Sequence, residues 1–155
     1  MEAPKFRAYD GGSLNRMYQP DEVMVGGGNI WIIDEDSVAG DWIVNNDLHL
    51  MQSTGLKDKN GKEIFEGDIL KFNDEWNEYC HEGYVDGSVE GVNYVEVVKG
   101  EACFEFGKTR YPESSLFIHM EDEHLSFAEL VNDKDFEFEI IGNVYENPDL
   151  LEEKK

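Results

Sequence analysis

Leu50–Lys71, LMQSTGLKDKNGKEIFEGDILK, contains two closely spaced turn signals and constrains the fold more than any other stretch of the 155-residue chain. Asn60-Gly61 is the favoured pair for a two-residue type I′ turn, in which both residues need positive φ. Gly67-Asp68 marks a second reversal, because glycine reaches positive φ without strain and an Asp side chain can bond the nearby backbone. The stretch therefore predicts a tight hairpin, a Gly-Asp turn and then an apolar strand from Ile69.

Strand signals continue through the rest of the chain and predict a mainly β protein. Alternating apolar and polar residues, together with β-branched and aromatic side chains, mark the segments. We expect one small curved sheet, or an SH3-like partly open barrel, built from Ile64–Phe72, Val92–Val98, Ala102–Phe106 and Phe136–Ile140. In the last segment, FEFEI, strict alternation predicts that both Phe side chains enter the core.

Other segments carry weaker or helical signals. Ser126 and Glu129 fit a capping box and predict one short helix at 126–131. Asn147-Pro148 predicts a short C-terminal turn, because Asn suits the N-cap and Pro the first helical position. Leu116–Ile118 is expected to be a short strand, and the polar segment Asn73–His81 a loop or a short helical turn. We expect an N-terminal β segment, 1–49, packed on a barrel body, 50–152, with a tail at 153–155.

Two motifs in order carry a resemblance to a known family. TGLKDKNGKEIFEGDI (Thr54–Ile69), followed by IGNVYENPDLLE (Ile141–Glu152), resembles the YopX-like family of phage and prophage proteins, and the opening KFRAYD (Lys5–Asp10) is similar to the start of that family. The resemblance implies a compact, largely β protein encoded by phages of Gram-positive bacteria. The molecular function of the family is uncharacterised, so the resemblance supplies no catalytic or binding residues.

The formal charge of −22 restricts the classes of partner. A protein that binds nucleic acid directly needs a basic surface to neutralise phosphates, and an acidic protein is also repelled by anionic membranes. Two interpretations of the acidity stay open. The carboxylates form a solvated surface that keeps the protein dispersed, or they imitate DNA and block a host DNA-binding or defence protein.

The sequence predicts a cytoplasmic protein of the host bacterial cell. No run approaches about 18 apolar residues, and the opening MEAPKFRAYD lacks the apolar region of a secretory signal. Cys80 and Cys103 do not form a C-x-x-C pair, so we expect two reduced thiols, with a single disulfide as the alternative.

The sequence gives only weak indications of metal-binding or catalytic residues. His119–His124, HMEDEH, combines two imidazoles with three carboxylates, which are ligand types for a divalent metal. Their spacing matches neither H-E-x-x-H nor a helical i, i+4 pair, so we expect a solvated acidic loop. Cys80 and His81 are adjacent, and adjacent side chains on an extended chain point to opposite sides. We therefore expect no catalytic, cofactor-binding or metal-binding residues, with a metal-dependent enzyme kept as an alternative.

The turn-rich stretch is also a basic island. Lys or Arg is absent from both Met17–Leu56 and Phe72–Val98, whereas four lysines lie between them. Lysines on a solvated strand edge discourage aggregation, or they form an interaction surface for a partner or for self-association, with Lys57, Lys59, Asn60 and Lys62 as its candidate residues. The leading hypothesis is a non-enzymatic phage accessory protein that binds a host or phage protein.

Overall fold

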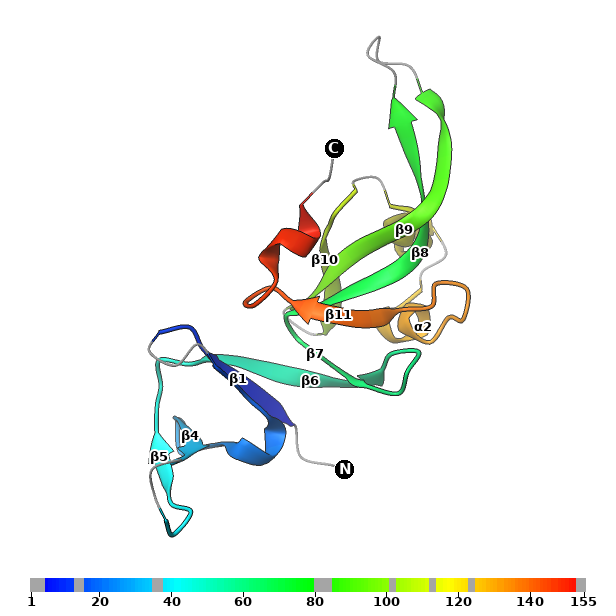
Figure 1. Cartoon of the computed structure of the whole chain (residues 1–155). Helices are drawn as coiled ribbons and strands as arrows, with labels where there is room; N and C mark the ends of the chain where they lie inside the picture. Colours follow the sequence, from blue (N-terminus) through cyan, green and yellow to red (C-terminus); the bar gives the residue numbers. More distant parts are fainter. Residues whose placement is uncertain are drawn as a thin grey trace. The chain divides into compact units, whose positions relative to one another are not determined.

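The structure is a computed structural model that describes residues 5–12, 16–34, 38–79, 85–100, 103–111, 114–122 and 125–152; for 76–79, 85–89, 118, 119 and 122 it describes the backbone alone. The chain divides into two compact units, Met1–Thr54 and Gly55–Lys155, and each is described by itself (Figure 1). The division falls inside a strand. The expected segment 1–49 packed on a body 50–152 stays a prediction. In the described ranges, no helix is long and apolar enough to cross a membrane.

The N-terminal unit contains two sets of antiparallel strands. In the first, β1 (Phe6–Asp10) lies between β2 (Arg16–Tyr18) and β6 (His49–Lys57). The second is a three-stranded sheet in the order β3 (Val23–Gly26), β4 (Asn29–Ile33) and β5 (Trp42–Val44).

A tight glycine turn and a small core hold this unit together. Gly27 and Gly28 both have positive φ and form the two-residue turn between β3 and β4, as a type I′ turn requires. The short 3-10 helix Pro20–Glu22 leads into β3. The buried core consists of Ala8, Tyr18, Val23, Ile32 and Leu48.

The C-terminal unit is built on one curled antiparallel sheet. Beyond β6 the chain turns into β7 (Glu63–Phe65), and the curled sheet follows in the spatial order β10 (Phe104–Thr109), β9 (Val85–Lys99), β8 (Asp68–Tyr79) and β11 (Glu139–Asn143). The long strands β8 and β9 bend strongly along their length (Figure 1). The prediction of a mainly β protein with a curved sheet or partly open barrel is confirmed.

Two helices and a cluster of aromatic rings complete the core of this unit. Helix α1 (Ser115–Asp122) lies against β8 and α2 (Phe127–Val131) against β10. Phe138 is 2% exposed, and its ring centroid lies 5.1 Å from that of Phe72 and 5.4 Å from that of Phe106. Aromatic rings at such spacings stabilise a core beyond the area that they bury.

The predicted short helix is confirmed together with its cap. The Ser126 hydroxyl accepts a hydrogen bond from the amide of Glu129 at 3.2 Å, and the Glu129 carboxylate accepts one from the amide of Ser126 at 3.3 Å. The predicted C-terminal turn is also present, as the 3-10 helix Pro148–Leu151. The capped helix follows from local side-chain chemistry that is visible in the sequence. Asn147 makes no capping hydrogen bond, and its side-chain oxygen instead accepts from the amide of Asn143.

Three secondary-structure predictions are wrong. The acidic loop expected at His119–His124 is one of them, because His119–Asp122 belongs to α1 and the last two residues lie outside the described ones. Leu116–Ile118 lies in α1 and not in a strand; a short apolar run does not distinguish a buried strand from a buried helix. The polar segment after Phe72 continues β8 to Tyr79, because it pairs with β9 as far as Tyr79↔Val85, with a register shift between Glu78 and Tyr79. The ladder therefore overrides the weak local strand propensity of this segment.

The segment Phe136–Ile140 is partly a strand. Phe136 and Phe138 are both buried, as predicted, but β11 begins only at Glu139. Glu137 has φ 50°, a value that interrupts a strand. The carbonyl groups of Phe136 and Phe138 instead accept hydrogen bonds from Asn73 and Lys59.

Candidate functional site

The basic hairpin tip is a tight turn of a different type from the one predicted. The amide of Asp58 donates to the carbonyl of Lys62 at 2.8 Å, and that of Gly61 donates to the carbonyl of Asp58 at 3.0 Å. Gly61 has φ 81°, as predicted, but among the described residues Glu137 alone has a positive φ without being glycine. Asn60 therefore does not have the φ of a type I′ turn. The arrangement is a three-residue loop that ends in a glycine bulge.

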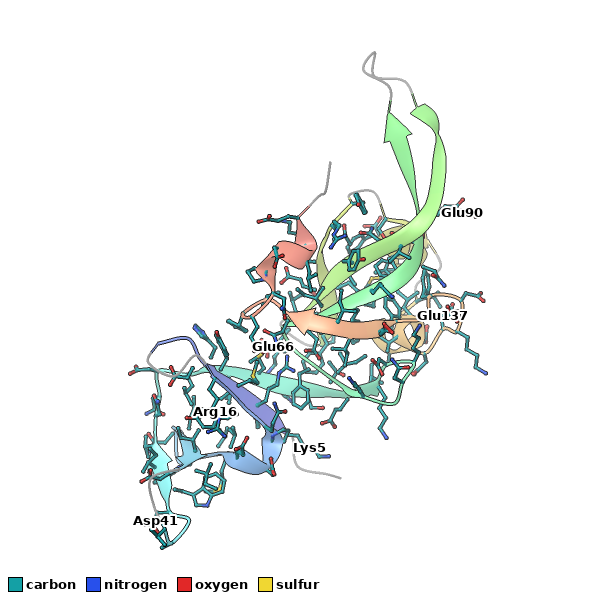
Figure 2. All side chains as sticks on the ribbon, viewed as in Figure 1. Lys5, Arg16, Asp41, Glu66, Glu90 and Glu137 are labelled. Atoms are coloured by element: carbon teal, nitrogen blue, oxygen red, sulfur yellow. The ribbon has the colours of Figure 1, made fainter. Side chains whose placement is uncertain are left out.

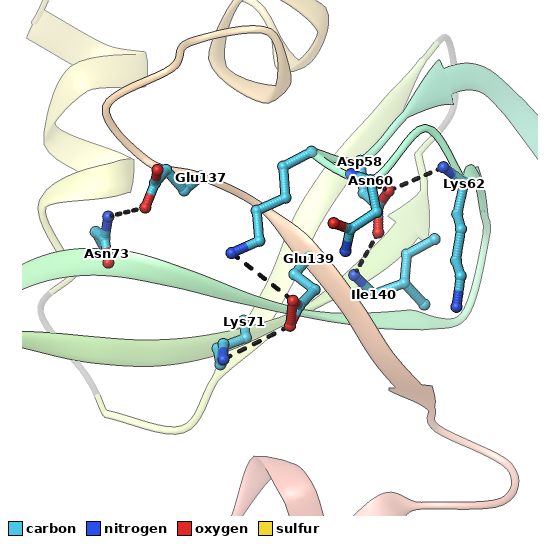
Figure 3. Close-up of polar contacts among 9 residues, drawn as sticks. Asp58, Asn60, Lys62, Lys71, Asn73, Glu137, Glu139 and Ile140 are labelled. Carbon is cyan, nitrogen blue, oxygen red and sulfur yellow. Dashed lines mark hydrogen bonds and ion pairs between the residues drawn. The ribbon is translucent and has the colours of Figure 1, made fainter.

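The Asp58 carboxylate organises this tip and is itself buried. One oxygen accepts from the amides of Asn60 and Lys62, both at 2.9 Å. The other accepts from the amide of Ile140 at 3.0 Å (Figure 3). The amide of Lys59 also donates to the carbonyl of Phe138 at 2.9 Å. The hairpin is thus bonded directly to the segment that opens β11.

All four residues of the predicted interaction surface are exposed on this hairpin, namely Lys57, Lys59, Asn60 and Lys62. The Lys59 ammonium lies 3.7 Å from the Glu139 carboxylate, and the Lys71 ammonium lies 3.6 Å from the same carboxylate (Figure 3). A groove of about 380 Å³ beside the hairpin is lined by both acidic and basic side chains, including Lys57, Asp133, Lys134 and Glu137. The basic island is therefore partly balanced by carboxylates on neighbouring segments.

A larger, acidic groove of about 790 Å³ lies over β8 and β9. The acidic residues that line it are Asp74, Glu75, Glu90, Asp133 and Asp135. The buried Asp74 carboxylate accepts from the Asn93 side chain at 2.8 Å and from the Ser115 hydroxyl at 2.7 Å. It also accepts from the Ser115 amide, at the start of α1. Asp74 therefore acts in the framework, and the remaining carboxylates give the groove its charge.

Side chains of the second sequence motif also form the hydrogen bonds of a turn. The buried Asn143 side chain accepts from the amides of Tyr145 and Glu146 at 3.1 and 2.9 Å, and donates to the Glu146 carboxylate at 2.8 Å. A Cβ on Gly142 would lie 2.5 Å from the Asn147 side-chain oxygen. The Asn143 side chain therefore holds the turn after β11, and Gly142 leaves room for the Asn147 side chain beside it.

Most of the residues considered as metal ligands or as a nucleophile lie outside the residues that the structure describes. Cys80, His81 and His124 are not among the described residues, and the side chain of His119 is not described. Cys103 is exposed. Within the described ranges, no group of three or more His, Cys, Asp or Glu side chains is arranged to hold a metal ion.

The N-terminal unit has an exposed apolar surface that was not predicted from the sequence. Trp42, Ile43 and Val44 make up β5, and their exposed fractions are 38%, 43% and 43%. Across the sheet, Met24 pairs with Trp31 and Trp31 with Val44, so these three side chains share one face. Met24 is itself 50% exposed. The one sequence feature that could have indicated it is Trp42–Val44, a run of three apolar residues. Such a run is equally typical of a buried strand in a core.

Comparisons with known proteins cover nearly the whole chain. Residues 5–152 match the family model described as YopX protein. The fold is similar to the crystal structure of protein EF1440 from Enterococcus faecalis, with 26% sequence identity, a TM-score of 0.55, and coverage of 98% of this chain and 100% of that one. The sequence has no significant match among curated proteins.

Proposed function

The chain belongs to the YopX family, and on that premise we propose that it is a phage or prophage accessory protein that works as a non-enzymatic protein-interaction module. The observation that carries the proposal is the apolar surface on one face of β3–β5, defined here as the β5 surface and formed by Met24, Trp31, Trp42 and Val44. The proposed partner is a host or phage protein.

Exposed apolar side chains lie together on the β5 surface, although the chain as a whole is strongly acidic. Contiguous exposed apolar patches on soluble proteins commonly mark binding surfaces, and Trp and Met are enriched in the cores of interfaces. Trp42 also lies on an edge strand, where natural proteins usually place charged residues or Pro to prevent pairing. β5 contains neither kind of residue. A partner that covers the β5 surface explains this departure.

The two sequence motifs support a role as a scaffold. Asp58 bonds three backbone amides, and Asn143 bonds two. These side chains hydrogen-bond to backbone amides of the turns. We therefore place the binding surface elsewhere on the protein. The basic hairpin of Lys57, Lys59, Asn60 and Lys62 stays a second predicted contact surface.

The proposal is tested by affinity capture of the tagged chain from infected host cells. Three forms are compared: the wild type, the double variant Trp42→Ser with Val44→Ser, and the control Val92→Ser. Val92 is 41% exposed and lies beside the acidic groove of the C-terminal unit. It therefore matches Val44 in type and exposure, and loss of the partner by this control alone would favour the groove as the binding site. We expect a partner that the wild type and the control retain and that the double variant loses. A partner retained equally by all three forms would contradict the assignment of the surface.

A second candidate function is imitation of DNA by the acidic groove. The favouring observation is the set of carboxylates around the space over β8 and β9. Adding duplex DNA to the capture separates the two functions, because DNA displaces a partner held by imitation and leaves one held by the β5 surface in place.

A further inference from the structure

The outer edge of β5 presents backbone groups as well as side chains. Among the described strands, β5 ends its three-stranded sheet and pairs with β4 alone. The amide of Asp34 donates to Asp41 at 2.8 Å and that of Asn45 donates to Ile30 at 2.9 Å. In an antiparallel pair these hydrogen-bonded positions alternate with positions that face outward. The Ile43 backbone therefore faces β4, and the amide and carbonyl groups of Trp42 and Val44 face the open edge.

Both faces of this edge strand are apolar. Trp42 and Val44 project on one face and Ile43 on the other, because successive side chains alternate across a strand, and all three are exposed. An added strand with apolar side chains would cover them while pairing with the outward backbone groups. This is the mode in which an extended peptide joins an exposed sheet edge.

The charges around the edge select the kind of strand that it accepts. Asp41 immediately precedes β5 (Figure 2), and Asp34 stands opposite it at the end of β4. Asp47 follows closely after β5, and no Lys or Arg occurs anywhere in Met17–Leu56. A second copy of the chain would bring the same carboxylates and a further net charge of −22 to the contact. The resulting repulsion opposes the pairing of two β5 strands. A segment rich in Lys or Arg meets complementary charge.

We propose that the open edge of β5 binds an extended, basic segment of the partner protein, whose Lys or Arg side chains alternate with apolar ones, as an additional strand. The inference rests on the proposed function and names the chemistry of the partner. Main-chain hydrogen bonds to Trp42 and Val44 supply the pairing, and the β5 surface receives the apolar side chains. The neighbouring Asp side chains set the preference for positive charge.

The test uses four synthetic peptides of about nine residues, the upper range of natural strand lengths. The first alternates Lys with Val. The second alternates Glu with Val, and the third alternates Lys with Ser. The fourth has the sequence of the first but is N-methylated at the amides that would donate hydrogen bonds to β5. Binding to the full chain is measured by fluorescence anisotropy, and hydrogen exchange of the Trp42 and Val44 amides is followed with the first peptide. We expect the first peptide to bind at least tenfold more tightly than each of the others, and to slow exchange at both amides.

Two protein variants locate the contact. Val44→Pro removes an amide that faces the open edge, a position where a strand tolerates Pro, and we expect it to weaken binding of the Lys-Val peptide at least tenfold. Trp42→Ser is expected to act similarly, and Val92→Ser to leave binding unchanged. Because Val44→Pro could disturb β5, circular dichroism checks its fold, and the N-methylated peptide tests the same hydrogen bonds on the wild-type protein.

The outcomes that overturn the inference are distinct. Equal binding of the Lys-Val and Glu-Val peptides, binding that survives both Val44→Pro and Trp42→Ser, or no binding of any peptide each contradicts it. Dimerisation in sedimentation velocity that Val44→Pro abolishes would make a second copy the occupant. If cellular capture still depends on Trp42 and Val44 while the peptides fail, the proposed function stands and the basic added strand is rejected. If capture does not depend on them, the proposed function fails.

Discussion

The buried carboxylate of Asp58 accepts a hydrogen bond from the backbone amide of Ile140 at 3.0 Å, across 82 positions of sequence. The bond joins the hairpin of the first motif to the strand of the second. The β11–β8 ladder continues the connection through Ile140↔Leu70 and Asn143↔Asp68. The two motifs therefore lie side by side and are hydrogen-bonded to each other. Their characteristic side chains hold the turns and strands of this region in place.

This connection predicts the effect of removing the Asp58 carboxylate. We expect Asp58→Ala to lower the free energy of unfolding of the C-terminal unit by about 2–4 kcal/mol, because backbone amides lose a charged acceptor. Asp58→Asn, which keeps one acceptor oxygen, should lose less. Hydrogen exchange of the β8 amides in denaturant measures the change in this unit alone. Glu121→Ala is the control, because Glu121 is exposed. An Asp58→Ala effect as small as that of Glu121→Ala would show that the bond to Ile140 is unimportant.

The glycine bulge of the hairpin predicts a smaller effect. Gly61 has φ 81°, so we expect Gly61→Ala to lower stability by about 1 kcal/mol, because a Cβ is strained in that region. Gly26→Ala is the matched control, since Gly26 has no positive φ and its Cβ would meet no atom within 4 Å. Equal melting shifts for the two variants would contradict the assignment of the turn.

The close approach at Gly142 predicts coupling between two substitutions. A Cβ on Gly142 would lie 2.5 Å from the Asn147 oxygen, so we expect Gly142→Ala to lower stability by about 1–3 kcal/mol through steric strain. In an Asn147→Ala background the same substitution should be less destabilising, because the crowded atom is gone. A double-mutant cycle in urea measures the coupling. Strictly additive effects would mean that the strain arises elsewhere.

The acidic groove gives a prediction that separates solubility from imitation of DNA. We expect the variant Glu75→Gln, Glu90→Gln, Asp133→Asn, Asp135→Asn to fold and to bind the captured partner within about threefold of the wild type at each salt concentration. If the groove imitates DNA, binding and its salt dependence should both fall sharply in this variant, because interactions between exposed charges are screened by salt. A titration of the partner at several salt concentrations distinguishes the two results.

The sequence predicted those parts of the fold that depend on local chemistry. The capping box at Ser126 and the positive φ of Gly61 could be predicted because neighbouring residues determine them. The type of the hairpin turn could not, because the Asp58 carboxylate binds both the tip and the distant Ile140. Strict alternation at Phe136–Ile140 predicted burial correctly but not the strand, because Glu137 adopts positive φ between two buried rings.

The candidate binding surface was harder to predict for a topological reason. Trp42–Val44 has the composition of a buried central strand, and only its position at the end of the β3–β5 sheet makes it an exposed edge. Strand order is set by long-range pairing, which a single sequence does not reveal. The basic hairpin, in contrast, was recognisable because its lysines lie close together in the sequence.

We propose that this protein binds its partner through the β5 surface, while the two motifs hold the fold. Hydrogen exchange of the full chain, measured with and without the captured partner, tests this claim most directly. We predict slower exchange concentrated in β3 and β5, at Val23–Gly26 and Trp42–Val44, with the hairpin Lys57–Lys62 changed less. Protection confined to Gly55–Lys155, at the hairpin or the acidic groove, would contradict it.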